Sequence, residues 1–260
     1  MNRIERIGRL WLCLTMIFLL APVLILLVDS VNSATSFPSP FERLTLRWYD
    51  ALLHRQSFLD AALRSLEVAL LAGAIATSVA FLSAYALSRA PMRGRHVIAT
   101  ALMSPLFVPE IVLSFAILQV AGLFGMGIDL VTMALTHAVF VMPFVLRLVL
   151  AAFSRFDFNL EDAARSLGAR PATALWHVTI PILRPSLIAG FMLTAILSFV
   201  NLPVSMFLTT ADTATLPVAM FAYMESRMDP MIAAAGTMIV LLAAGATWLL
   251  DRSLKVHVLG

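Results

Sequence analysis

The sequence predicts an all-α, polytopic membrane protein with six transmembrane helices. Of the 260 residues, 61% are hydrophobic and only 13% are charged, and the mean hydropathy is +0.94. A soluble domain of this length carries far more charge. Six apolar stretches also approach the roughly 20 residues that a helix needs to cross a bilayer. We therefore predict a single transmembrane domain over residues 1–260.

The six predicted spans are separated by short polar or glycine-rich segments. We place them near residues 10–28, 63–87, 97–121, 130–151, 186–208 and 231–250. The first run has the basic start of a signal peptide, but it is long and no convincing cleavage site follows it, so we interpret it as a span. The single cysteine, Cys13, lies in this run and is interpreted as a packing residue.

Basic residues gather in alternate loops of this predicted topology. The loops that we assign to the cytoplasm contain Arg3, Arg6, Arg9, Arg89, Arg93, Arg95, Arg155, Arg165, Arg170, Arg184, Arg252 and Lys255. On the other side, arginines are offset by acidic residues. The positive-inside rule therefore places both termini and the loop 152–185 in the cytoplasm. The net charge of +3 follows from this topology and gives no argument for binding nucleic acid.

The cytoplasmic loop 152–185 contains a predicted helical elbow, residues 160–181, which we call the elbow. Its first helix has one apolar face, formed by Leu160, Ala163, Ala164 and Leu167. Gly168 stands where a helix C-terminus favours a positive φ, and Pro171 suits the first position of a second helix. Pro181 is expected to stop that helix. An elbow of this kind is suited to docking a soluble partner.

The elbow resembles the EAA loop of permease subunits from binding-protein-dependent ABC importers. That pattern reads Glu-Ala-Ala, three residues, Gly, nine residues, and Ile-x-Leu-Pro. The corresponding positions, with the spacing intact, are Asp162, Ala163, Ala164, Gly168, Val178, Ile180 and Pro181. Three of them depart conservatively from the pattern, with Asp162 in place of Glu, Val178 in place of Ile and Ile180 in place of Leu. Glu161 offers a longer carboxylate one residue early. The resemblance implies that the elbow docks on a cytoplasmic ATPase subunit, where Glu161 or Asp162 pairs with a basic residue.

The resemblance also implies a fold, a location and partners. The fold would be the MetI-like core of five spans with one extra N-terminal span, in a bacterial inner membrane. The chain would pair with a second permease, identical or similar, bind two ATPase subunits, and receive solute from an extracytoplasmic solute-binding protein. The stretches 44–49, 109–112 and 215–218 resemble the polyamine-type (spermidine/putrescine) branch. That branch also handles other small organic solutes.

Two polar residues at membrane depth are candidates for the translocation path. Glu110 directly follows Pro109 within the third span, and charged groups at this depth are costly unless they serve a function. It either lines the path and favours a cationic solute, or caps a broken helix, or pairs with Arg147 or another buried donor. For Asn201 in the fifth span, pore lining and interhelical hydrogen bonding remain equally open. His137 is expected to join helices.

The sequence contains no recognisable catalytic motif. Lys255 is its only lysine and no phosphate-binding glycine motif precedes it, and neither His-Glu-x-x-His nor Gly-x-Ser-x-Gly occurs. We therefore predict no catalytic residue, metal or cofactor, with ATPase activity on a partner subunit. The alternative is a stand-alone secondary transporter or channel, for which Glu110 is the candidate coupling-ion residue. An intramembrane enzyme would need a nucleophile–base or metal constellation that we do not find.

Overall fold

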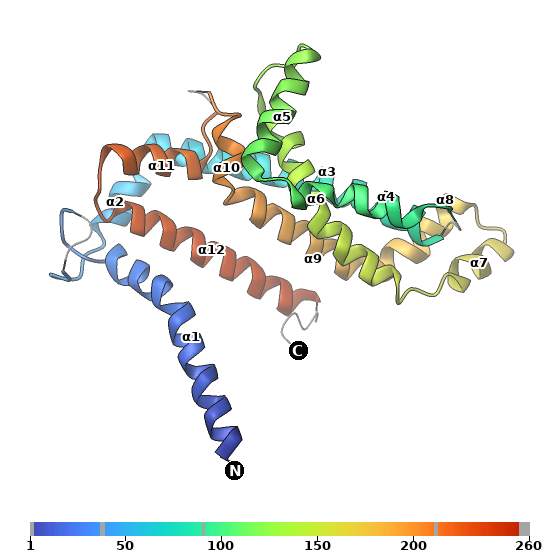
Figure 1. Cartoon of the computed structure of the whole chain (residues 1–260), viewed down its shortest axis with the longest axis horizontal. Coiled ribbons are helices and arrows are strands. Elements are labelled where there is room, and N and C mark those ends of the chain that lie inside the picture. Colours follow the sequence, from blue (N-terminus) through green and yellow to red (C-terminus); the bar gives the residue numbers. More distant parts are fainter. Residues whose placement is uncertain (1–2, 37–39, 90–91, 211–212, 255–260) are drawn as a thin grey trace. The chain divides into compact units, whose positions relative to one another are not determined.

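The structure is a computed structural model that describes residues 3–36, 40–89, 92–210 and 213–254 (Figure 1). These ranges are mostly helical, and within them pairing of the strand type is limited to one isolated bridge between Asn32 and Leu44. The predicted all-α membrane class is confirmed. Lys255, which the charge argument used, lies outside the described residues.

Five helical segments among the described residues are long and apolar enough to cross a membrane. They are Ile7–Ser30, Gln56–Arg89, Leu130–Phe153, Pro171–Phe199 and Met231–Leu249. They belong to α1 (Arg3–Ser30), α3 (Gln56–Arg89), α6 (Leu130–Phe153), the series α8 (Pro171–Ala174), η2 (Leu175–Thr179) and α9 (Ile180–Phe199), and α12 (Met231–Leu254). The shorter helices include α2 (Arg47–Leu53), α7 (Asn159–Ser166), α10 (Leu202–Met206) and α11 (Leu216–Ser226).

The third predicted span, 97–121, is not one continuous helix. It consists of α4 (Arg95–Leu102), the 3-10 turn η1 (Ser104–Phe107) and α5 (Glu110–Leu123). Pro105 and Pro109 lie at the two breaks that follow α4, and a proline removes a backbone donor and clashes with the preceding turn. The predicted count of six spans is therefore not confirmed, and the exact span limits remain predictions.

The chain divides into two compact units. The first comprises Met1–Asp60 and Ala219–Ala244, and the second comprises Ala61–Val218 and Gly245–Gly260. In the first unit the side chain of Asn32 organises the loop after α1, since its Oδ1 accepts from the backbone N–H groups of Ala34 (3.2 Å) and Glu42 (3.0 Å). These side-chain bonds add to the backbone pairing of the same loop, where the Ser33 N–H donates to Arg43 O (2.9 Å) and the Thr45 N–H donates to Val31 O (2.8 Å).

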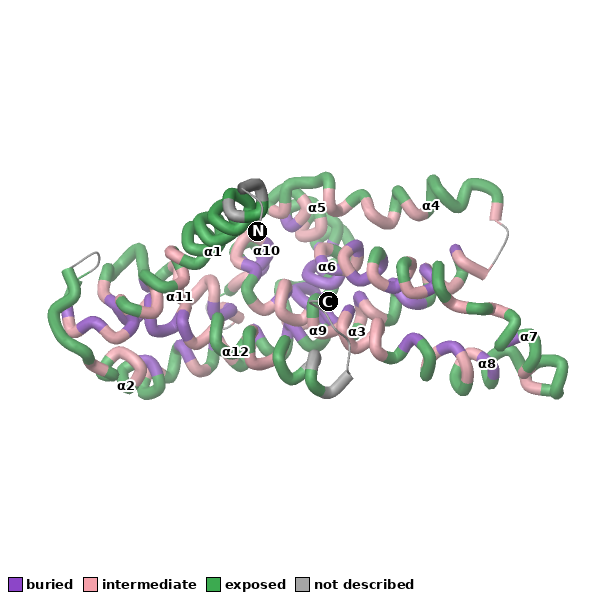
Figure 2. Tube along the Cα trace, turned by 90° about the horizontal axis from the view of Figure 1, so that it is seen from below, coloured by how far each residue is buried: buried purple, intermediate pink, exposed green. Residues whose placement is uncertain are grey.

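The second unit is built around α6, whose buried positions Figure 2 marks in purple. Val141, Val145, Leu146 and Val149 are fully buried there, and α6 packs along α9. The two helices approach closely at Gly190, where an added Cβ would lie 2.5 Å from Val145 Cγ2. This close packing holds α6 and α9 together. The two helices carry His137 and Ser198, polar residues that are described below.

Candidate functional site

The first helix of the elbow is α7, and Gly168 terminates it as predicted. Gly168 has φ +93°, its N–H donates to Arg165 O (3.0 Å), and the N–H of Ala169 donates to Ala164 O (3.1 Å). This pair of bonds is the Schellman arrangement, which requires a left-handed residue after the helix. The predicted conformation of Gly168 is confirmed, and Pro171 occupies the start of α8 as predicted.

Pro181, by contrast, does not stop the second helix. The chain continues through it from α8, by way of the π-helical turn η2, to the end of α9 at Phe199. A proline inside a helix lacks a donor and pushes against the carbonyl of the residue four positions earlier. The wider π turn immediately before Pro181 accommodates this, as insertions of this kind do in other helices. The prediction of a stop was wrong.

The elbow presents an exposed apolar face. Leu160 and Leu167 are 47% and 90% exposed, and Ala163 between them is also exposed, whereas Ala164 is half-buried. Further along the elbow, Val178 and Ile180 are half-buried and Pro181 is exposed. The predicted one-sided distribution of apolar residues on α7 is thus present, with three of its four members open to a partner.

Glu161 points into the protein rather than outward. It is only 2% exposed, it accepts hydrogen bonds from Tyr85 Oη (3.1 Å) and from Thr179 Oγ1, and Arg89 Nε lies 3.8 Å from its Oε2. The carboxylate of Glu161 is thus satisfied within this chain, and the pairing of Glu161 or Asp162 with a basic residue of an ATPase subunit stays a prediction.

Asp162 is half-exposed and forms an ion pair with Arg89. Arg89 Nη1 donates to Asp162 Oδ2 (3.3 Å), and Nη2 donates to Oδ1. These bonds from the guanidinium hold the pKa of the Asp162 carboxyl below its usual range. Arg165 lies on the same surface, with Nη1 3.9 Å from Asp162 Oδ1.

The two candidate path residues, Glu110 and Asn201, contact each other. Asn201 Nδ2 donates to Glu110 Oε2 (2.8 Å), although the residues are 91 positions apart. Asn201 Oδ1 accepts from the backbone N–H of Val204 (2.7 Å) and so caps α10. The partner of Glu110 is thus Asn201, whereas Arg147, the donor considered from the sequence, is exposed.

His137 extends this polar pair through two serines. Its Nδ1 lies 2.8 Å from Ser198 Oγ and its Nε2 lies 3.2 Å from Ser205 Oγ. Ser205 Oγ already donates its proton to Asn201 O (2.8 Å), so we assign the donor of the His137–Ser205 bond to Nε2–H and let Nδ1 accept from Ser198. The imidazole therefore joins α6 to both sides of the break between α9 and α10, as its expected role in joining helices requires.

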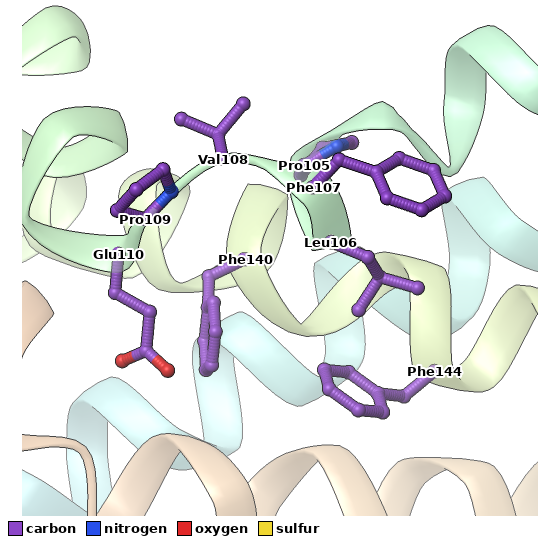
Figure 3. Close-up of a pocket in the computed structure, with 8 residues that line it drawn as sticks. All are labelled: Pro105, Leu106, Phe107, Val108, Pro109, Glu110, Phe140 and Phe144. Atoms are coloured by element: carbon purple, nitrogen blue, oxygen red, sulfur yellow. The ribbon is translucent and has the colours of Figure 1, made fainter.

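A pocket of about 360 Å³ opens beside Glu110. It is lined by residues 105–110 together with Phe140 and Phe144 of α6. Figure 3 shows the Glu110 carboxylate extending from the start of α5 on the same side as the ring of Phe140. A pocket that is lined by a carboxylate and two aromatic rings is suited to a small cation. In the described part of the chain, no group of three or more His, Cys, Asp or Glu side chains is placed to hold a metal ion.

Comparison with known proteins decides the family. No family model matches the chain. It is 30% identical over 226 residues to the spermidine/putrescine transport system permease protein PotC of Escherichia coli strain K12, covering 87% of this chain and 85% of PotC. The chain belongs to the ABC importer permeases. The putrescine permease PotI of the same strain is 28% identical over 251 residues, covering 92% of this permease and 89% of PotI.

Solved structures agree on the fold of this permease. A bacterial ABC transporter that imports the acidic polysaccharide alginate matches with a TM-score of 0.73 at 18% identity and covers 99% of both chains. The MetNI methionine ABC transporter matches with a TM-score of 0.60 at 18% identity, over 82% of this permease and 98% of that chain. Among the relatives found by sequence, the probable molybdenum ABC transporter permease protein of Haloferax volcanii is 32% identical over 212 residues, covering 78% of this permease and 76% of that protein.

The partners of Glu161 and Asp162 within this permease are not predicted from the sequence. Tyr85 and Thr179 were not singled out, and Arg89 was used only as a topological charge. Tyr85 and Arg89 stand four residues apart at the end of a predicted span, which puts them on one helix face. That spacing was the available signal for a polar contact. The partners of this face lie more than 70 positions away, where no local pattern identifies them.

Proposed function

We propose that this permease is the translocating subunit of an importer in a bacterial inner membrane and moves a small, cationic, polyamine-like solute inward. Separate ATPase subunits hydrolyse the ATP and dock on the elbow, and both termini lie in the cytoplasm. A second permease, identical or similar, completes the pathway, and an extracytoplasmic solute-binding protein delivers the solute. The observation that carries the solute class is the Glu110–Asn201 pair beside its pocket.

The side chains that line the pocket support a cationic solute. The Glu110 carboxylate can accept charge-assisted hydrogen bonds from an ammonium group, and the rings of Phe140 and Phe144 offer cation–π contact. The pocket volume of about 360 Å³ lies at the lower end of the range for small-molecule sites, roughly 300–1,000 Å³. An oxyanion would be repelled by Glu110. The names of PotC and PotI, both polyamine permeases, agree with this preference.

The surface of the elbow supports docking of an ATPase subunit. Leu160 and Leu167 are exposed apolar side chains on a helix with small neighbours, which allow close approach of a partner. The bonds of the buried Glu161 hold α7 in place on the side away from this face. Coupling follows if closure of two ATPase subunits moves the elbows and alternates the spans between inward and outward states.

Docking is tested by co-purification of the tagged permease expressed with its ATPase and solute-binding protein. The Gly168→Pro variant removes the N–H that closes the turn and cannot adopt the positive φ, so it should lose the ATPase while still inserting in the membrane. The Gly122→Ala variant is the control, since an added Cβ there meets nothing within 4 Å. Equal ATPase recovery with Gly168→Pro would refute docking at the elbow.

The solute class is tested by uptake of labelled putrescine in cells that lack other polyamine importers. Glu110→Gln retains an oxygen that can accept from Asn201 but removes the negative charge, so uptake should fall strongly while ATPase co-purification is unchanged. The control is Glu67→Gln, which changes an exposed glutamate paired with Arg64. An unchanged putrescine uptake rate in Glu110→Gln would remove Glu110 from the path.

A further inference from the structure

A second polar cluster lies on the inner side of the elbow, facing away from the exposed apolar face. It consists of Tyr85 and Arg89 at the end of α3, Glu161 and Asp162 on α7, and Thr179 in η2, and we call these five residues the elbow cluster. All five belong to the second unit of the chain. The cluster therefore connects the elbow to two of the long helices of that unit, α3 and the helix that continues into α9.

Glu161 is the centre of the elbow cluster. A buried carboxylate is unfavourable unless donors satisfy it, and here the donors come from two different elements. Thr179 Oγ1 donates to Oε1, and Tyr85 Oη donates to Oε2 (3.1 Å). Because each donor belongs to a different helix, a displacement of α7 that keeps Glu161 satisfied must carry both helices with it.

Arg89 joins the two acidic residues of α7. Its guanidinium pairs with Asp162 through two nitrogens, while its Nε stays 3.8 Å from Glu161. Its Cζ also lies 5.2 Å from the centre of the Phe158 ring. A planar guanidinium held by a forked carboxylate contact and an aromatic face has a fixed orientation, unlike a lysine ammonium at the same place.

Aromatic packing stiffens the α3 side of the elbow cluster. The ring of Tyr85 lies 6.0 Å from that of Phe153 and 6.4 Å from that of Phe158, and the last two rings stack at 6.0 Å. These rings come from α3, the end of α6 and the segment that enters α7. The Tyr85 donor of Glu161 is consequently held in a packed group of aromatic rings.

We infer that the elbow cluster transmits movement of the elbow to α3 and α9, with Tyr85, Arg89 and Thr179 as positioning residues of the coupling. This inference rests on the proposed docking of an ATPase subunit at the elbow. The exposed face of Leu160, Ala163 and Leu167 receives the partner, and the elbow cluster on the opposite side passes the displacement on. Docking and transmission are thereby assigned to different residues, so they can be separated by mutation.

The experiment uses the complete complex in nanodiscs, with a thiol reporter in the second unit. The background is Cys13→Ser, which removes the only cysteine, and the reporter is Phe107→Cys, an exposed position that lines the pocket. The labelling rate of the reporter by a maleimide is measured with and without ATP plus vanadate. The amount of bound ATPase subunit and the rate of ATP hydrolysis are measured on the same sample.

The informative variants are Thr179→Val, which is nearly isosteric and removes one donor, and Arg89→Ala. Both should keep the ATPase bound and hydrolysing ATP but lose the ATP-dependent change in labelling, and Arg89→Lys should recover it in part. The matched control is Arg95→Ala, which removes an exposed arginine and should leave the change intact.

Other outcomes overturn the inference in distinguishable ways. A full ATP-dependent change in both variants, or a reporter that does not respond in the otherwise unaltered complex, shows that the elbow cluster transmits nothing to this part of the chain. Loss of the ATPase from both variants shows that the cluster only shapes the docking surface. Absence of the ATPase from the unaltered complex overturns the proposed docking itself, and the inference with it.

Discussion

Gly168 is required by the geometry of the turn and not by crowding, since nothing lies within 4 Å of an added Cβ but φ is +93°. A side chain in this left-handed region costs about 1–2 kcal/mol for most residues and less for asparagine. Gly168→Ala should therefore raise the deuterium exchange rates of the α7 amides about ten-fold, whereas Gly168→Asn should raise them less. Equal rates in the two variants would contradict the conformational explanation.

The ion pair of Asp162 with Arg89 predicts how the elbow responds to pH. The pair lowers the pKa of Asp162 below its ordinary value of 3.8. A depressed carboxyl pKa contributes stability above the ordinary value, and that contribution is lost as the pH falls through the depressed one. Protection of the α7 amides, corrected for intrinsic exchange, should therefore be equal at pH 7 and pH 5. Weaker protection at pH 5 would mean that another group controls the elbow.

The residues that the sequence identified correctly are those whose role is local. Gly168 and Pro171 could be assigned because a helix end is decided by its nearest neighbours in the chain. The direction of Glu161 could not be assigned, because its donor Tyr85 is 76 positions away. Glu110 and Asn201 were each predicted as candidates, but their contact depends on the packing of α5 against α10, which no local pattern contains.

The packing of α6 against α9 depends on a glycine. A Cβ at position 190 would approach Val145 Cγ2 to 2.5 Å, and overpacking of this kind typically costs about 1–3 kcal/mol. Gly190→Ala should therefore lower the thermal unfolding temperature of the purified permease. Adding Val145→Ala removes the methyl group that clashes, so the double variant should be more stable than the sum of the single effects by about 0.5–3 kcal/mol.

The control for this cycle is Gly122→Ala in α5, where the new methyl group meets nothing within 4 Å and the helix gains propensity. That variant should unfold at the same temperature as the unaltered permease or slightly above it. Strict additivity of Gly190→Ala and Val145→Ala would show that the two residues do not interact, and the close approach of α6 and α9 would then not explain the need for glycine.

At the scale of elements, prolines limited what the sequence could predict. Pro105 and Pro109 disrupt the third predicted span, as their positions in the sequence indicate, and divide it into α4, η1 and α5. At Pro181 the same residue type was expected to end a helix that in fact continues through η2 into α9. The outcome at each proline depends on whether the surrounding backbone can widen into a π turn or must break, and this is decided by tertiary packing.

For the whole molecule, the divided segment from α4 to α5 decides the side on which the elbow lies. In the part of the chain that the structure describes, five helical segments are long and apolar enough to cross the membrane. The segment from α4 to α5 would provide a sixth crossing, as the distribution of arginines requires. Phosphatase fusions after residue 126 should then be active, and those after residues 92 and 156 inactive, with fluorescent-protein fusions giving the opposite pattern.

If fusions after 92 and 126 report the same side, the segment does not cross. With a cytoplasmic N-terminus the elbow would then face away from the cytoplasm, where no ATPase subunit can reach it, and the proposed docking would fail.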